Sequence, residues 1–149
     1  MIRFASGSRA LLCALTMMSG GCGKFQQARE CGTFVKTVNA WLASSDAQNA
    51  ADAGTSSDPK QVAAQARGTA EHYAELSRRL AGLHVQSEDL APRVQRYEQI
   101  ADSAAATLRE VAEALEHGDL EKARQKRVDF DTVARREPPL VKEINGLCR

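Results

Sequence analysis

The chain has 149 residues, a formal net charge of +1 and only 5% aromatic residues. This length is enough for one domain and excludes two of ordinary size. The near-neutral charge excludes the strongly basic surface that nucleic-acid binding requires, and a chain rich in Ala, Glu, Gln, Arg and Leu but poor in aromatic residues favours helices over sheets.

The amino-terminal segment has the three parts of a secretory signal peptide. Arg3 and Arg9 supply positive charge, Ala10–Met18 form a short apolar run, and the small residues Ser19–Gly21 precede Cys22. The apolar run is too short to cross a bilayer, which takes about 20 helical residues. We therefore predict export, after which the loss of both arginines changes the formal charge from +1 to −1.

The segment Ser19-Gly20-Gly21-Cys22 resembles the lipobox of bacterial lipoproteins. The resemblance implies that residues 1–21 are removed, that Cys22 carries the lipid, and that the mature chain is anchored on the periplasmic side of the cell envelope. The length of the mature chain predicts that residues 22–149 form one domain. Gly23, at a position where Asp marks inner-membrane retention in that family, implies the outer membrane rather than the inner. Ser19 replaces the usual Leu of the lipobox, so a secreted or soluble periplasmic protein remains the alternative.

The cysteines of the mature chain form an even set. Cys13 leaves with the signal and Cys22 is used by the lipid, so Cys31 and Cys148 remain. In an oxidising compartment this pair predicts a disulfide, with two buried free thiols as the alternative. The bridge would close a loop longer than about 100 residues, which stabilises the fold by about 4–5 kcal/mol in the chain-entropy model.

Helical periodicity begins close to the anchor. A first helix is predicted over residues 25–45, with an apolar stripe widened by two aromatic residues: Ala28, Cys31, Val35, Val38 and Leu42, with Phe34 and Trp41 beside them. Ser44–Asp58 are polar or small, and this composition predicts a loop.

The second helix has a clear start and a regular seam. Asp58 can cap it, Pro59 suits its first position, and Gln61 follows three residues after the cap. Its predicted seam is Val62, Ala66, Thr69, Tyr73, Leu76, Leu80 and Leu83. Such regular spacing is typical of helices that pack at shallow angles in a bundle.

The third helix follows a short link at residues 84–87. Pro92 is acceptable because it lies in the first turn, and Gly118 and Asp119 are expected to end this helix and cap the next. Its predicted seam is Leu90, Val94, Tyr97, Ala101, Ala104, Leu108, Val111 and Leu115.

The fourth helix starts at Leu120 and should break or bend at Pro138-Pro139, before a last apolar segment that ends at Cys148. We therefore predict an all-α fold, an up-down bundle of about four antiparallel helices. In that topology the start of the first helix and the end of the fourth lie together, where the predicted disulfide needs them.

The most distinctive charged surface lies on the fourth helix. A basic stretch is interrupted there by two acidic residues; its members are Lys122, Arg124, Lys126, Arg127, Arg135 and Arg136. It is interpreted first as charge complementarity between neighbouring helices, and otherwise as a strip facing anionic lipid or an acidic partner.

Recognisable catalytic and cofactor motifs are missing from the sequence. It contains no CxxCH for haem, no Glu-x-x-His for a di-metal site, and no Met after Met18. We therefore expect no enzyme activity, no cofactor and no metal. The main prediction is a membrane-anchored protein-interaction or envelope-structural module with an unknown protein partner. The alternative is a helical bundle that binds a small ligand or lipid.

Overall fold

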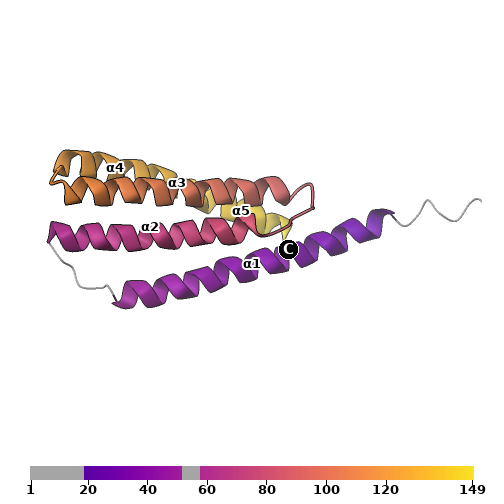
Figure 1. The fold of residues 1–149 in the computed structure, drawn as a ribbon. Helices are drawn as coiled ribbons and strands as arrows, with labels where there is room; N and C mark the ends of the chain where they lie inside the picture. The colour runs from indigo at the N-terminus through magenta and orange to yellow at the C-terminus, as the bar shows by residue number, and fades with distance from the viewer. Residues whose placement is uncertain (1–18, 52–57) are drawn as a thin grey trace, which may run out of the picture.

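The computed structural model describes residues 19–51 and 58–149, with side chains over 23–44 and from 58 onward. These residues form five helices and no strand (Figure 1), which confirms the all-α prediction: α1 (Ser19–Ala51), α2 (Pro59–Ala81), α3 (Ala91–Glu116), α4 (Leu120–Ala134) and α5 (Glu137–Leu147). The predicted signal peptide lies outside the described residues except for the backbone of 19–21. The side chain of Cys22 also lies outside them.

The antiparallel pair α2 and α3 packs along its whole length and forms the most extensive interface of the molecule. Asp58 caps α2 as predicted, because its side chain accepts a hydrogen bond from the Lys60 amide at 3.0 Å. Small side chains fill the interface: Ala63 and Ala70 on α2 are buried, and so are Ala104 and Ala112 on α3. Alanine at these positions lets the two backbones approach closely.

The predicted seam of α3 is confirmed: all its residues are buried except Leu115, which is half-buried. The seam of α2 is only partly correct, since Leu76 and Leu80 are buried but Thr69 is exposed. Gly118 ends the α3–α4 connection with a φ of +73°, in the left-handed region that glycine adopts without strain. Asp119 then caps α4 by accepting from the Lys122 amide at 3.0 Å.

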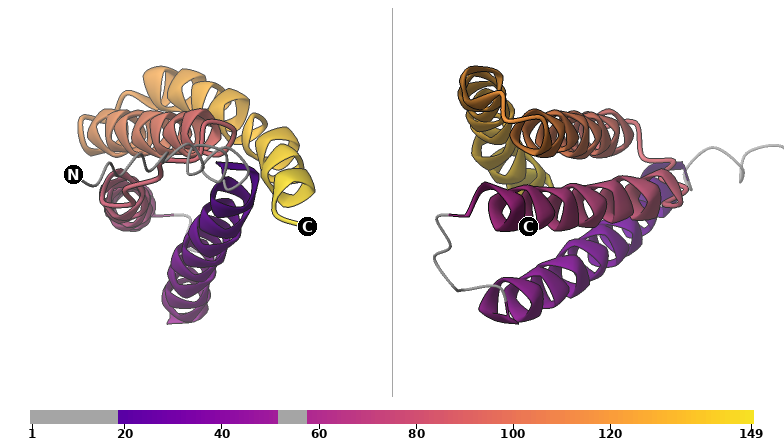
Figure 2. Two further views of the ribbon diagram at one scale, coloured as in Figure 1. Left: turned by 90° about the vertical axis from the view of Figure 1, so that its right-hand side faces the viewer. Right: turned by 60° about the vertical axis from the view of Figure 1, so that its left-hand side comes forward.

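The fourth helix is split in two, one turn before the predicted position. α4 ends at Ala134, and Pro138 and Pro139 lie in the first turn of α5. A proline has no amide hydrogen to donate to the carbonyl four residues earlier, so the helix fails before the prolines, which then fit a new first turn. The break redirects the chain so that α5 leads back towards α1 (Figure 2).

α1 differs from the prediction in length and in orientation. It continues to Ala51, so the predicted Ser44–Asp58 loop is wrong up to that residue; the alanines at 47, 50 and 51 favour helix. Its buried face is Cys31, Phe34 and Trp41 with Val38 packed against them, whereas the predicted stripe residues Ala28, Val35 and Leu42 are exposed. Towards its C-terminal end α1 leans away from α2 (Figure 1 and Figure 2). No neighbouring helix therefore runs along the whole of α1, and a continuous apolar seam on it would not be covered.

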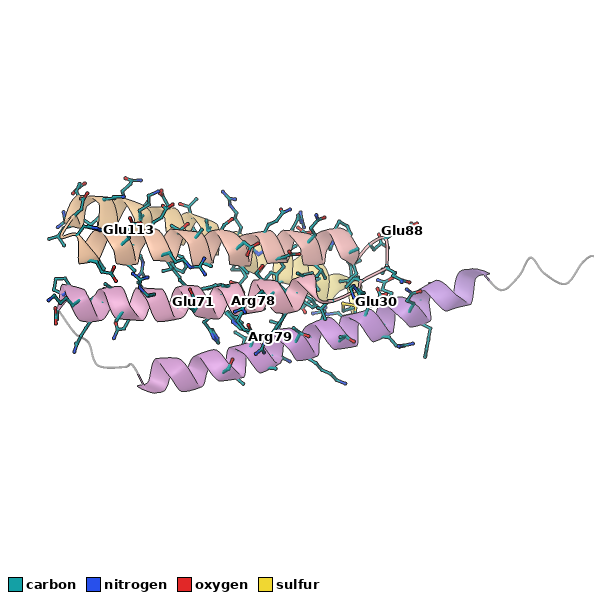
Figure 3. All side chains as sticks on the ribbon, viewed as in Figure 1. Glu30, Glu71, Arg78, Arg79, Glu88 and Glu113 are labelled. Carbon is teal, nitrogen blue, oxygen red and sulfur yellow. A yellow bond between two sulfur atoms is a disulfide. The ribbon has the colours of Figure 1, made fainter. Side chains whose placement is uncertain are left out.

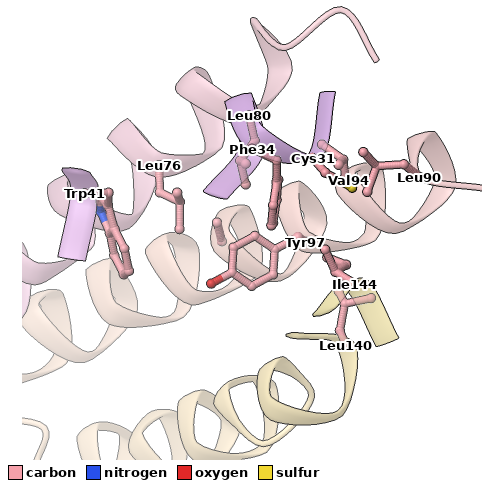
Figure 4. Close-up of a cluster of buried hydrophobic side chains, with 11 residues drawn as sticks. Cys31, Phe34, Trp41, Leu76, Leu80, Leu90, Val94, Tyr97, Leu140 and Ile144 are labelled. Atoms are coloured by element: carbon pink, nitrogen blue, oxygen red, sulfur yellow. The ribbon is translucent and has the colours of Figure 1, made fainter. Parts of the chain in front are cut away.

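The hydrophobic core gathers where α1, α3 and α5 meet α2 (Figure 4). Tyr97 of α3 lies at its centre, edge-on to Phe34 with ring centroids 5.8 Å apart. Its hydroxyl donates to Oε1 of Glu137 at 2.5 Å, and burial together with this hydrogen bond raises the pKa of Tyr97 far above its usual range. The buried phenol thus has a partner in the first turn of α5.

The predicted disulfide is present. Cys31 of α1 and Cys148, directly after α5, are bonded with their Cα atoms 5.6 Å apart and 117 residues apart in sequence. The topology brings the two ends of the fold together, as expected for an up-down bundle. The bridge attaches α1 to the end of α5.

Candidate functional site

The outward face of α1 carries a line of apolar residues that no helix covers. Phe25 is 70% exposed, Val35 37% and Leu42 43%, and Ala28 between them is exposed too. These four positions are spaced 3, 7 and 7 residues, which places them on one side of the helix. We call Phe25, Ala28, Val35 and Leu42 the outward stripe.

Basic side chains accompany the outward stripe. Lys24, Arg29 and Lys36 are exposed, and none forms an ion pair within the part of the chain that the structure describes. The acidic residue of this helix segment, Glu30, attracts Arg29 and accepts hydrogen bonds from the segment that links α2 to α3. The outward stripe is therefore accompanied by exposed basic side chains that form no ion pair among the described residues.

A cavity of about 670 Å³ opens at the start of the outward stripe. It lies between α1 and the segment that links α2 to α3, and its apolar walls are Phe25, Leu83 and Val85. Thr33, His84 and Gln86 add polar groups to its lining. Its volume falls in the range of small-molecule sites, and its position lets a side chain of a docked partner enter it.

Glu30 fixes the geometry of this cavity by joining α1 to the α2–α3 link (Figure 3). Its carboxylate accepts hydrogen bonds from the backbone amides of Gln86 and Ser87, each at 3.0 Å, and from the side chain of Gln26 at 3.0 Å. Desolvation acts to raise the pKa of Glu30, but these hydrogen bonds outweigh it and leave the pKa below its usual value. Glu30 is therefore a structural anion that holds the link against α1.

The basic stretch of α4 is divided into paired and unpaired residues. Nζ of Lys126 lies 2.5 Å from Glu110 of α3, Arg124 pairs with Glu121 and Arg127 with Asp131. The other three members, Lys122, Arg135 and Arg136, are exposed and have no acidic partner among the described residues. The stretch is thus not one continuous cationic strip.

The three histidines lie apart from one another. His72 stacks on Trp41 with ring centroids 5.0 Å apart, His84 lines the cavity, and Nδ1 of His117 lies 2.8 Å from the carbonyl oxygen of Glu113. Within residues 23–44 and 58–149, no group of three His, Cys, Asp or Glu side chains is placed to hold a metal ion. None of the described helices has the length and apolar character needed to cross a membrane.

Comparison with protein-family models, curated proteins and solved structures gives no match to this chain.

Sequence reasoning did not identify the outward stripe as a surface. The signal was present, because the sequence of α1 has two neighbouring sets of apolar residues at helical spacing. The structure buries the set that contains Phe34 and Trp41 and exposes the outward stripe. A single packing partner can cover only one set, so the second set indicated a further contact. The cavity beside Phe25 had no such signal, since it depends on how the α2–α3 link folds against α1.

Proposed function

We propose that this chain is a membrane-anchored extracytoplasmic helical module, without a catalytic role, that binds a partner protein through the outward stripe of α1. One observation carries the proposal: Phe25, Val35 and Leu42 are exposed in line on a single helix. Scattered exposed apolar residues need no explanation, but an aligned set is typical of helix recognition with anchors one and two turns apart.

The charge of this face indicates the chemistry of the partner. Lys24, Arg29 and Lys36 flank the stripe and form no ion pair in the described structure, so an amphipathic helix with acidic flanks is complementary to it. A second copy of this chain is disfavoured, because pairing two identical stripes in parallel from a shared membrane would bring these cations together. We therefore commit to an acidic helical partner.

The anchor is the part of the proposal that follows from the lipobox resemblance. Cys22 precedes Phe25 by three residues, so a lipid on Cys22 would hold the start of the outward stripe near the bilayer. The expected result of Cys22→Ala is loss of the chain from the membrane fraction. Unchanged membrane attachment of this variant would overturn the anchor but not the interaction surface.

Site-specific photo-crosslinking in intact cells tests the interaction surface. A photoreactive residue replaces Val35 in one version and Val128 in the other; the control position is a valine on α4 that is 58% exposed. We expect position 35, and not 128, to crosslink to one protein whose contact segment is acidic and helical. The double variant Arg29→Glu, Lys36→Glu should lower the yield at least tenfold, while Lys122→Glu, Arg135→Glu, which reverses two unpaired cations on the α4 side, should leave it unchanged.

Three results would overturn the partner assignment. Crosslinks only to a second copy would make the stripe a dimer interface, and crosslinks only to lipid would make it a membrane contact. Equal yields at positions 35 and 128 would remove the stripe as a specific surface.

The alternative function, binding of a small ligand or lipid, is supported by the cavity of about 670 Å³ beside Phe25. It predicts that blocking this cavity, as with Thr33→Trp, abolishes uptake of the ligand. The proposal of a partner protein instead predicts that the residue at position 35 still crosslinks to a protein after small molecules have been removed from the membranes, because no ligand is needed for that contact.

A further inference from the structure

A second cavity, of about 430 Å³, lies where α4 gives way to α5. Its apolar wall is formed by Ile100 of α3, Val133 of α4 and Leu140 of α5. Its polar lining includes Arg96, Arg136 and Glu143. Three helices thus surround a hollow that is far from the outward stripe in sequence and draws no residue from α1.

The polar lining of this cavity has more positive than negative charge. The carboxylate of Glu143 accepts a short hydrogen bond from Arg96, and its Oε2 lies 3.5 Å from Nε of Arg93. Nε of Arg93 is buried and has no hydrogen-bond partner in the described structure. The carboxylate of Glu143 is therefore already shared by Arg93 and Arg96, and Arg136 adds a further positive charge.

Arg136 adds a cation with no counterion. It lies in the turn between Ala134 and Glu137, and no carboxylate among the described residues is within ion-pairing distance of it. The prolines that follow force this turn, so the helix break is what places the guanidinium at the edge of the hollow. Its neighbour Arg135 is equally exposed and unpaired but does not line the cavity.

We propose that this cavity binds a small organic monoanion with an apolar body, whose carboxylate or other oxyanion head pairs with Arg136. The guanidinium presents several donors that match an oxyanion, and the Ile100, Val133 and Leu140 side chains cover an apolar tail. The volume lies within the range of sites for small ligands. This site is independent of the proposed partner surface, because no residue is common to the two.

Octanoate, at concentrations where it forms no micelles, is a suitable probe for the purified full chain. Calorimetric titration gives affinities, and amide chemical shifts locate the site. Octanol keeps the tail and removes the charge, whereas acetate keeps the charge and removes the tail. We expect octanoate to bind at least tenfold more tightly than either, with saturable shifts confined to residues 96–103 and 133–143.

The two neighbouring arginines provide a matched pair of variants. Arg136→Gln should weaken octanoate binding about tenfold, which corresponds to the loss of one charge-assisted contact, while Arg135→Gln should leave the affinity unchanged. Both positions are exposed, so neither variant should alter the helical circular dichroism. The proposal is overturned if octanoate does not bind, if octanol binds as well, if the two variants behave alike, or if the shifts map to residues 25–33 and 83–86.

Discussion

The α2–α3 pair and the α1 helix are held to the same bundle in different ways. α2 and α3 meet along their full length through buried alanines and through exposed cross-helix ion pairs such as Arg67–Glu116 at 2.7 Å. α1 instead makes its contacts over one stretch, through three buried residues, the Cys31–Cys148 bridge and the Glu30 carboxylate.

The difference indicates that the bundle has a close-packed body and an attached arm. Many small side chains are buried along α2 and α3, so the stability of this interface depends on how closely the two helix surfaces fit together. The arm depends on a few attachment points, and it can therefore expose a whole apolar stripe to a partner.

The largest effect is expected from removal of the disulfide. Cys31→Ser with Cys148→Ser should lower the free energy of unfolding by about 4–5 kcal/mol, because the unfolded chain regains the freedom of a long loop. Amide hydrogen exchange should rise more in α1 than in α2 and α3. If protection falls equally in all three helices, or if denaturant unfolding shows no loss, α1 is not held as a separate arm.

A smaller effect is expected from overpacking the body. Ala70 of α2 is fully buried, so Ala70→Leu should destabilise the chain by about 1–3 kcal/mol in urea unfolding, through clashes with α3. Ala64→Leu adds the same side chain at an exposed position of the same helix and should change stability by less than about 0.5 kcal/mol. Equal effects of the two substitutions would contradict the close α2–α3 packing.

The body was also the part of the fold that could be predicted. α3 is covered on its apolar side by α2 and α4, so its seam repeats regularly and residues such as Val94, Leu108 and Val111 are buried as expected. The caps at Asp58 and Asp119 were predictable because they use local hydrogen bonds.

The arm was less predictable because its environment is tertiary. The direction in which α1 leans decides whether Val35 or Phe34 faces the core, and nothing within the helix fixes that direction. The disulfide was predicted from cysteine arithmetic, whereas both cavities arise from how loops and helix ends fold together. Arg136 was selected as part of a basic stretch, but only the position of the α4–α5 break sets it beside a hollow.

The smallest effect tests the carboxylate that joins the arm to the α2–α3 link. Glu30→Gln keeps the shape of the side chain and removes the negative charge that accepts hydrogen bonds from the Gln86 and Ser87 amides. We therefore expect the free energy of unfolding near neutral pH to fall by about 1 kcal/mol, as for other carboxylates that accept hydrogen bonds from backbone amides.

Because the pKa of Glu30 in the fold lies below its usual 4.5, the contribution of its charge to stability is complete above that pH and is lost as the pH falls through the folded value. The stability difference between wild type and variant, followed by urea unfolding from pH 7 to pH 3, should therefore shrink in acid. Glu88→Gln is the matched control, since Glu88 lies exposed in the same link (Figure 3) and should change the free energy of unfolding at pH 7 by less than about 0.5 kcal/mol. A difference that stays constant with pH for Glu30→Gln would mean that its charge does not hold the arm.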